Sequence, residues 1–185
     1  MRGDSLKSME IAYIGLGGNV ASRVGEPEVT LARAVERLAS LGRVVRRSRL
    51  YSTAPVGFAD QPRFVNAVVA LETALPVNGL LAHLQGIERE FGRDRSAEFP
   101  NGPRTLDLDI LMYGEKRFVM PWVDIPHPRL SKRAFVLVPL AEIAPDAVVP
   151  GLNRRVKELL ESLNVNAAQE TDAVIAFDSN LWTGA

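Results

Sequence analysis

The sequence contains no cysteine and only two histidines, His83 and His127, among its 185 residues. The absence of cysteine excludes disulfides and thiolate metal centres. Two histidines are also too few for the usual zinc sites. A chain without disulfides fits the reducing environment of the cytoplasm, where we expect the protein to act.

The sequence also lacks an excess of charge of either sign and any long hydrophobic run. Its 22 basic and 22 acidic residues cancel, so no global field would attract a nucleic acid, and phosphate binding must depend on local clusters. No apolar segment reaches the length of a signal peptide or a membrane span. With 46% hydrophobic residues, the composition indicates one globular domain, which we expect to be a monomer with no nucleic-acid or membrane partner.

Apolar and acidic residues alternate along residues 106–110, where the sequence reads LDLDI. Successive side chains of a strand point to opposite faces, so Asp107 and Asp109 would share one face while the apolar residues share the other. The two carboxylates would lie roughly 7 Å apart, close enough to hold one or two Mg²⁺ ions. The same alternation is also typical of the solvated face of an edge strand, so the pair alone does not decide between these interpretations.

Hydrophobic periodicity predicts the order strand, helix, strand, strand, helix, strand, followed by two more helices. The expected strands cover residues 11–16, 43–52, 64–71 and 106–113, and the expected helices cover residues 31–41, 80–91, 135–143 and 156–163. This order is the split βαβ pattern of an α+β, ferredoxin-like sandwich (a βαββαβ core) with C-terminal additions. We expect a single domain over residues 11–163, with an N-terminal extension at 1–10 and a tail at 164–185 that shows no recognisable chemistry.

Three further features favour a ligand site, although each also has a purely structural interpretation. The glycines in residues 15–18 would admit a ligand close to the backbone, or simply form a turn. Residues 53–62 form a loop rich in Pro and Gly, and loops of this length are often functional. Phe64 and Asn66 share a strand face and would suit a flat heteroaromatic ring, but they also fit a core phenylalanine and a capping asparagine.

Basic residues gather in two places near the acidic pair in our predicted arrangement. Arg93 and Arg95 follow the second helix, and residues 126–135 carry several more cationic side chains. Planar guanidinium groups match the oxygens of phosphate groups, so these clusters indicate a phosphate-binding site beside the aspartates.

Together these motifs resemble the 6-hydroxymethyl-7,8-dihydropterin pyrophosphokinase family. The similar runs are T-x-P-x-G from Thr53, D-Q-P-x-F-x-N from Asp60, G-P-R-T-L-D-L-D-I from Gly102, P-H at Pro126 and R-x-F at Arg133. They occur in the family's order between about Ile11 and Pro150. The resemblance implies an enzyme of folate biosynthesis that transfers the terminal pyrophosphoryl unit of ATP to the pterin hydroxymethyl oxygen and releases AMP.

The resemblance also implies roles for individual residues. The pterin would bind among Thr53, Val56, Phe64, Asn66 and Phe135. ATP would be bound by Gln85, Glu88, Arg93, Arg95, Arg104, Ile110, His127 and Arg133. Two Mg²⁺ ions would be held by Asp107 and Asp109, which with Arg93 and Arg104 form the catalytic set. Many relatives carry an Arg-Trp pair where this chain has Phe99, Pro100 and Asn101, so the chain departs from the family pattern in the loop that would close over ATP.

Two other classes of function share part of the pattern. A nucleotidyl transferase or cyclase of the ferredoxin-like palm type also uses paired aspartates and two Mg²⁺ ions. It offers no reason for the D-Q-P run or for Phe64 and Asn66, and it would release pyrophosphate in place of AMP. A non-catalytic binding module of the same fold would use its sheet as a surface, which the zero net charge and the 6% aromatic content disfavour.

Overall fold

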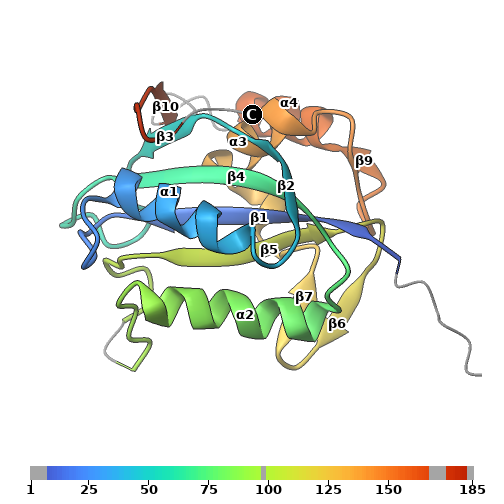
Figure 1. Ribbon diagram of the computed structural model, residues 1–185. Coiled ribbons are helices and arrows are strands. Elements are labelled where there is room, and N and C mark those ends of the chain that lie inside the picture. Colours follow the sequence, from blue (N-terminus) through green and yellow to red (C-terminus); the bar gives the residue numbers. More distant parts are fainter. Residues whose placement is uncertain (1–7, 97–98, 167–173, 183–185) are drawn as a thin grey trace, which may run out of the picture.

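The computed structural model describes residues 8–96, 99–166 and 174–182, which form a sheet covered by helices on both faces (Figure 1). The elements are β1 (Glu10–Gly18), α1 (Pro27–Leu38), β2 (Arg43–Arg47), β3 (Leu50–Thr53), β4 (Phe64–Thr73), α2 (Val77–Glu90), β5 (Asp107–Tyr113), β6 (Phe118–Met120), β7 (Val123–Ile125), a 3₁₀ turn (Leu130–Lys132), α3 (Ala134–Ile143), β8 (Val148–Val149), β9 (Arg154–Arg155), α4 (Val156–Asn166) and β10 (Val174–Phe177).

The main sheet has the strand order β10-β3-β4-β1-β5, with β2 also pairing with β4, and all its pairs are antiparallel. The four strands β3, β4, β1 and β5, together with α1 and α2, make up the predicted βαββαβ core, so the ferredoxin-like prediction is confirmed. The single strand expected over residues 43–52 is instead two strands. The break occurs at Ser48, whose hydroxyl accepts the Val68 N–H (3.0 Å) in place of a backbone carbonyl.

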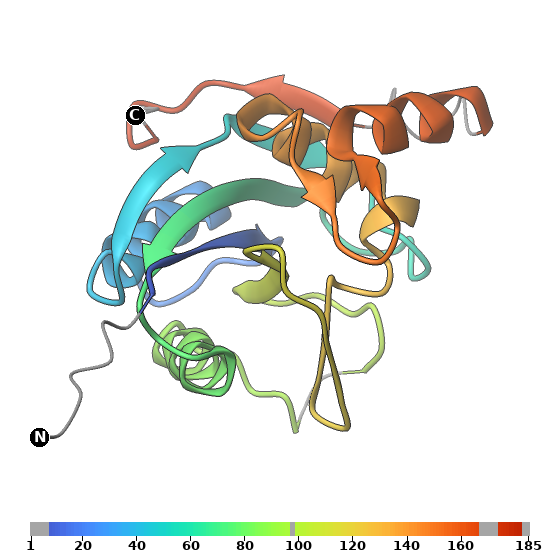
Figure 2. The same ribbon diagram turned by 90° about the vertical axis from the view of Figure 1, so that its right-hand side faces the viewer.

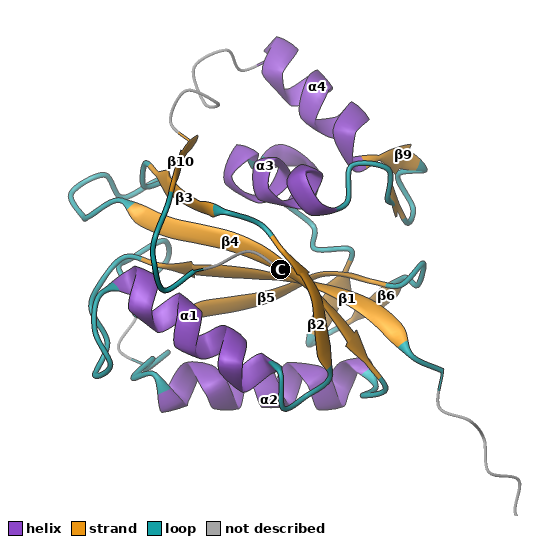
Figure 3. Ribbon diagram, turned by 45° about the horizontal axis from the view of Figure 1, so that its top comes forward, coloured by secondary structure: helices purple, strands orange, loops and turns teal. Residues whose placement is uncertain are grey.

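Each face of the sheet buries its own hydrophobic cluster. Helices α1 and α2 cover one face, where Leu31 and Leu84 are fully buried, and α3 and α4 cover the other, where Leu140 is fully buried. Figure 2 shows α2 and α4 on opposite sides of the sheet, and Figure 3 shows the helices as two layers around the strands. Within the described residues, no helix is long and apolar enough to cross a membrane.

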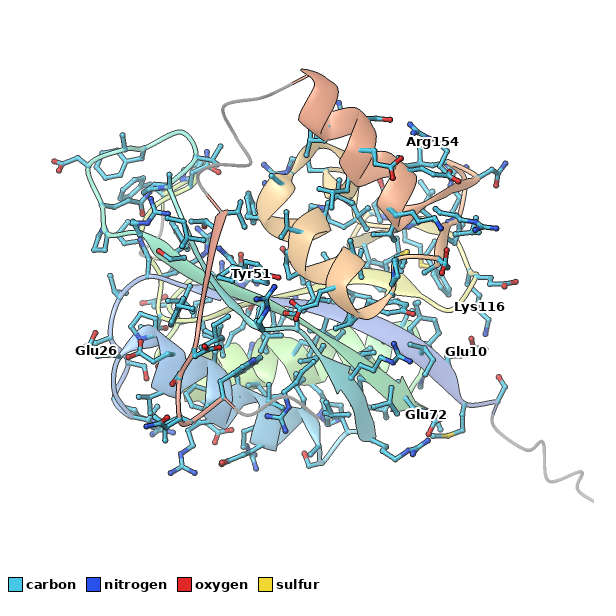
Figure 4. The ribbon with its side chains drawn as sticks, turned by 90° about the horizontal axis from the view of Figure 1, so that it is seen from above. Glu10, Glu26, Tyr51, Glu72, Lys116 and Arg154 are labelled. Atoms are coloured by element: carbon cyan, nitrogen blue, oxygen red, sulfur yellow. The ribbon has the colours of Figure 1, made fainter. Side chains whose placement is uncertain are left out.

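Polar contacts fasten α3 to the strand that leads into the site. The Tyr51 hydroxyl on β3 donates to Glu142 of α3 (2.7 Å), and Glu142 also accepts from the Arg49 backbone N–H (3.1 Å). Figure 4 shows Tyr51 close to the α3 layer. Burial and the bond to Glu142 raise the pKa of Tyr51 to about 12, so the hydroxyl keeps the proton that it donates.

The folded unit extends beyond the boundary expected at residue 163. Strand β10 pairs along β3, from Val174 opposite Thr53 to Phe177 opposite Leu50. Trp182 lies in the core with 6% of its surface exposed, and its indole N–H donates to the Ser48 carbonyl (2.7 Å). The region interpreted as a tail without chemistry therefore supplies an edge strand and a core residue.

We expect Trp182→Ala to lower the free energy of unfolding by about 3 kcal/mol, because it empties a large buried volume and leaves the Ser48 carbonyl without its indole donor. Urea denaturation would measure the change. Trp122→Ala is the matched control, since Trp122 is 51% exposed on the β6–β7 turn and should change stability by less than about 0.5 kcal/mol. Equal effects of the two substitutions would contradict the structural role of the C-terminal segment.

Candidate active site

The candidate site lies at the end of the sheet where β1 stops and β4 and β5 start, on the left in Figure 1. The register places Gly17 of β1 opposite Asn66 of β4 on one side and opposite Asp107 of β5 on the other. Gly15 is likewise opposite Asp109. Residues that the sequence placed in separate motifs are thus neighbours across three adjacent strands.

The glycines of β1 form the floor of the site. A Cβ atom added to Gly17 would lie 2.8 Å from Asn66 Oδ1, and one added to Gly18 would lie 2.4 Å from the Thr105 carbonyl oxygen. A side chain at Gly18 would collide with backbone, and one at Gly17 would have to displace the Asn66 amide, so glycine allows the close approach of neighbouring protein groups at both positions. The sequence suggested a turn or a ligand contact; the structure shows contacts with Asn66 and Thr105.

We expect Gly17→Ala to raise about tenfold the KM for the pterin that the family resemblance implies, because the new methyl group pushes the Asn66 amide away from its position in the site. Steady-state kinetics with varied pterin would measure this. Gly79→Ala on α2 is a suitable control, since its Cβ would be 3.6 Å from the nearest atom, an ordinary contact. An unchanged KM in Gly17→Ala would show that the Asn66 amide does not need this position.

The predicted alternation in β5 is confirmed. Leu108 and Ile110 are buried against the α1 and α2 layer, and Asp107 and Asp109 share the opposite face, where they line one hollow with His127. The acidic pair thus faces α3 and the basic segment before it.

The two carboxylates have different electrostatic environments. Burial alone would raise the pKa of Asp107, but Arg104 (Nε to Oδ2, 3.2 Å) and Arg93, which donates to Oδ1, hold it below the usual value. Burial, followed by the negative charges of Asp107 and Glu88, raises the pKa of Asp109 to about 6. Asp109 is therefore the carboxylate on which a bound cation would relieve the most repulsion.

Glu88, at the C-terminal end of α2, organises the arginines of this region. It is 1% exposed and accepts from Arg93 (2.7 Å), from Arg95 (2.7 Å) and from the backbone N–H of Leu108 (2.8 Å). A buried carboxylate needs such partners. Glu88 thereby connects α2, the following arginine segment and the start of the aspartate strand.

His127 is a neutral hydrogen-bonding group in this environment. Burial, followed by the charges of Arg133 and Arg129, lowers its pKa to about 4. The Arg129 backbone N–H donates to His127 Nδ1 (3.1 Å), which leaves Nε2 as the protonated nitrogen, 3.8 Å from Asp109. The side chain can therefore donate to a phosphate oxygen without carrying a charge.

A second hollow is lined by the five residues that were predicted to bind the pterin. It shares Asn66, Arg104 and Arg133 with the hollow around the two aspartates. The five predicted residues are Thr53, Val56, Phe64, Asn66 and Phe135. The Asn66 amide donates to the Thr53 hydroxyl (2.7 Å) within this hollow. Arg104 and Arg133 place their guanidinium carbons 4.9 Å and 5.2 Å from the centres of the Phe64 and Phe135 rings, respectively.

The structure brings together most of the residues predicted to bind ATP. Arg93, Arg95, Arg104, His127 and Arg133 line one polar hollow around Asp107 and Asp109, and Gln85 and Glu88 line the adjoining hollow beside Arg93. Ile110 is different, because its side chain is buried in the core on the other face of the sheet. Any contact of Ile110 with ATP must therefore come from its backbone.

The sequence alone assigned no role to Asn101, Arg129 or Asn19. Asn101 lines the hollow around Thr53 and Asn66, Arg129 lines the polar hollow, and Asn19, the residue after β1, is buried and bonded to the Arg104 backbone. Arg129 belongs to the basic segment that was recognised as a whole. The only sequence signal for Asn19 was its place after two glycines.

Comparison with known proteins identifies the family. The model of the 7,8-dihydro-6-hydroxymethylpterin-pyrophosphokinase (HPPK) family matches residues 13–145. The chain belongs to the HPPK family. It is 48% identical over 148 residues to the 2-amino-4-hydroxy-6-hydroxymethyldihydropteridine pyrophosphokinase of Pseudomonas aeruginosa, covering 80% of this chain and 88% of that protein. The protein of the same name from Methylorubrum extorquens is 42% identical over 166 residues, covering 89% and 100% of the two chains.

Solved structures agree with the HPPK fold. A Plasmodium falciparum HPPK-DHPS triple mutant superposes with a TM-score of 0.72 and 14% sequence identity, covering 94% of this chain. This chain spans 48% of that longer protein. At 14% sequence identity, this structural similarity is evidence for the fold alone. Membership in the HPPK family makes the chain an ATP-dependent pyrophosphokinase of folate biosynthesis, and it favours this function over the palm-type transferase and the binding module.

Proposed function

We propose that the HPPK reaction takes place between β4, β5 and α3, with the pterin in the hollow around Asn66 and the triphosphate of ATP over Asp107 and Asp109. The observation that carries this proposal is the register of β1, which places Gly17 between Asn66 and Asp107. The ring-binding side chains and the acidic pair are therefore separated by one strand, which has a glycine at this position. A hydroxymethyl group on the ring would reach the phosphate-binding side from there.

The pterin ring would bind between Phe64 and Phe135, with the Asn66 amide at its edge. Two aromatic faces supply stacking, and an amide supplies both a donor and an acceptor for the polar edge of the ring. The guanidinium groups of Arg104 and Arg133 now lie over these two rings. They must move off the ring faces when the pterin enters, and the nearby triphosphate offers them a stronger partner.

The reaction requires bond formation between the pterin hydroxymethyl oxygen and the β-phosphorus of ATP. The bond from that phosphorus to the oxygen bridging to the α-phosphorus breaks, AMP leaves with the electron pair, and the hydroxyl proton is released. Positioning and charge neutralisation supply most of the catalysis in such transfers. Arg93, Arg95 and His127 would hold phosphate oxygens in line for this step.

Asp107 and Asp109 would hold two Mg²⁺ ions. Carboxylate oxygens are the ligands that this cation prefers, and burial beside the negative charges of Asp107 and Glu88 raises the pKa of Asp109, which supports a cation at this position. Among the residues that the structure describes, no cluster of three or more His, Cys, Asp and Glu side chains is available. ATP and water would therefore complete the coordination. When bound, the ions neutralise charge on the transferred group and on the leaving phosphate.

The activity is tested by incubating the protein with Mg²⁺, ATP and 6-hydroxymethyl-7,8-dihydropterin and separating the products. AMP and pterin diphosphate should form in equal amounts. ADP would indicate transfer of a single phosphoryl group, and free pyrophosphate would indicate the palm-type reaction. Either product would overturn the proposed transfer.

We further infer that the protein acts as a monomer in the cytoplasm. All the groups named in the proposed reaction come from one chain, and the chain has no cysteine that an oxidising compartment would pair. Light scattering combined with size-exclusion chromatography would measure the mass, which should match the 20.2 kDa of one chain.

A further inference from the structure

Asn19 connects the end of β1 to two other segments of the site. It is 3% exposed, and its amide nitrogen donates to Gln61 Oε1 (3.0 Å) and to the Pro62 carbonyl (3.0 Å). Its amide oxygen accepts from the backbone N–H of Arg104 (2.9 Å), and its own N–H donates to the Arg104 carbonyl (3.0 Å). The side chain uses both of its donor hydrogens and its acceptor.

Gln61 extends this network to the loops over the pterin hollow. Its amide nitrogen donates to the Phe58 carbonyl (2.6 Å) and to the Asn101 carbonyl (2.8 Å), while its amide oxygen accepts from Asn19. The Phe58 and Phe99 rings meet edge to face, with their centres 5.3 Å apart. Two loops that are 40 residues apart in sequence are thereby joined above the pterin hollow.

Over residues 54–63 and 99–101, the parts of these loops that the structure describes, every residue is exposed or half-buried. The side chain of Val56 is 65% exposed, and Phe58 and Phe99 are also exposed. Loops without buried apolar anchors depend on their hydrogen bonds for a defined conformation. The Asn19 and Gln61 amides, together with the contact between the Phe58 and Phe99 rings, therefore constrain the wall of the pterin hollow.

We propose that Asn19 and Gln61 are positioning residues, which fix the loop around Phe58, the carbonyl of Asn101 and the backbone of Arg104 in one arrangement. The inference rests on the proposed function, because the two hollows must bind the pterin and the triphosphate for this arrangement to matter. Neither residue lines the hollows. Asn19 acts through Arg104, whose backbone it holds and whose side chain pairs with Asp107, and Gln61 acts through the loops around Phe58 and Asn101.

The two residues should differ in their kinetic effects. Gln61→Ala frees the loops but leaves the Asn19 bonds to Arg104, so the KM for the pterin should rise about tenfold while the KM for ATP changes less than about twofold. Asn19→Ala also removes the acceptor of the Arg104 N–H, so kcat should fall about tenfold in addition. Gln61→Glu keeps the acceptor but loses both donors, and it should resemble Gln61→Ala.

A double-mutant cycle with amide exchange tests the proposal. The effects of Asn19→Ala and Gln61→Ala on the KM for the pterin should be less than multiplicative, because either change breaks the same network. NMR of the ligand-free protein should show faster exchange of the Arg104 amide in Asn19→Ala alone. Asn78→Ala is the control, since Asn78 is an exposed amide on α2.

The outcomes separate this proposal from the proposed function. If the wild-type protein forms no AMP, the function is wrong, and the exchange of the Arg104 amide still tests the positioning role. If the wild-type protein is active but the variants keep the KM for the pterin within about twofold, the positioning role is wrong. Multiplicative effects, or unchanged Arg104 exchange in Asn19→Ala, would also overturn it.

Discussion

Replacing Asp109 with alanine is expected to lower kcat at least about 10³-fold, the largest effect of any substitution discussed for this protein. Asp109 faces the polar hollow, and Asp107, Glu88 and burial all disfavour its charge. A carboxylate in this environment destabilises the ligand-free protein, and cation binding would explain why the chain has one at this position. Asp107→Ala should have a similar effect on kcat, and Asp124→Ala, which removes an exposed carboxylate on β7, should have almost none.

The same argument predicts a gain in stability when the charge of Asp109 is removed. Without Mg²⁺, Asp109→Asn should raise the midpoint of thermal unfolding at pH 8, because the folded-state pKa of Asp109 lies near 6, above its usual value of 3.8. The cost of the charged carboxylate is present above pH 6 and disappears as the pH falls towards 4. The stability gain of the variant should therefore shrink over that range. A variant that is less stable than the wild type at pH 8 would contradict this account.

Replacing Arg93 with alanine should lower kcat about 10²-fold to 10³-fold, the second largest effect. The Arg93 side chain is 7% exposed and donates to both Glu88 and Asp107. Its loss leaves Asp107 paired with Arg104 and leaves the buried Glu88 paired with Arg95 among the ion pairs of the described residues. We therefore expect a lower free energy of unfolding as well, by about 3 kcal/mol.

Two further variants separate catalysis from stability at this position. Arg93→Lys keeps the charge but not the planar fork, so it should recover part of the stability and little of kcat. Arg33→Ala is the control, because Arg33 is exposed and pairs with Glu36 on α1. If Arg93→Lys restored kcat to within about twofold of the wild type, a point charge would suffice, and the fork would have no role.

The sequence predicted the core of the fold because its signals are local. The alternation in β5 and the helical spacing in α1 and α2 each lie within one element, so no knowledge of tertiary contacts was needed. The short pairs β6–β7 and β8–β9 and the strand β10 gave no comparable signal. Their pairing depends on distant partners, as when Val174 meets Thr53.

The residue types of the site could be predicted from motifs, but the positions of these residues relative to one another could not. The aspartates, the arginines and the aromatic residues each carry a recognisable chemistry, and the structure gathers them in adjoining hollows. The role of Gly17 could not be foreseen, because it depends on a register that places the residue between Asn66 and Asp107. The same holds for Asn19, whose partners lie 42 and 85 residues away in the sequence.

A crystal structure with Mg²⁺, the pterin substrate and α,β-methylene ATP would test the central claim most directly, because the methylene group prevents release of AMP. We predict two Mg²⁺ ions on Asp107 and Asp109, the pterin between Phe64 and Phe135, and the hydroxymethyl oxygen facing the β-phosphorus. Triphosphate bound away from the aspartates, or a pterin outside the hollow around Asn66, would contradict the account.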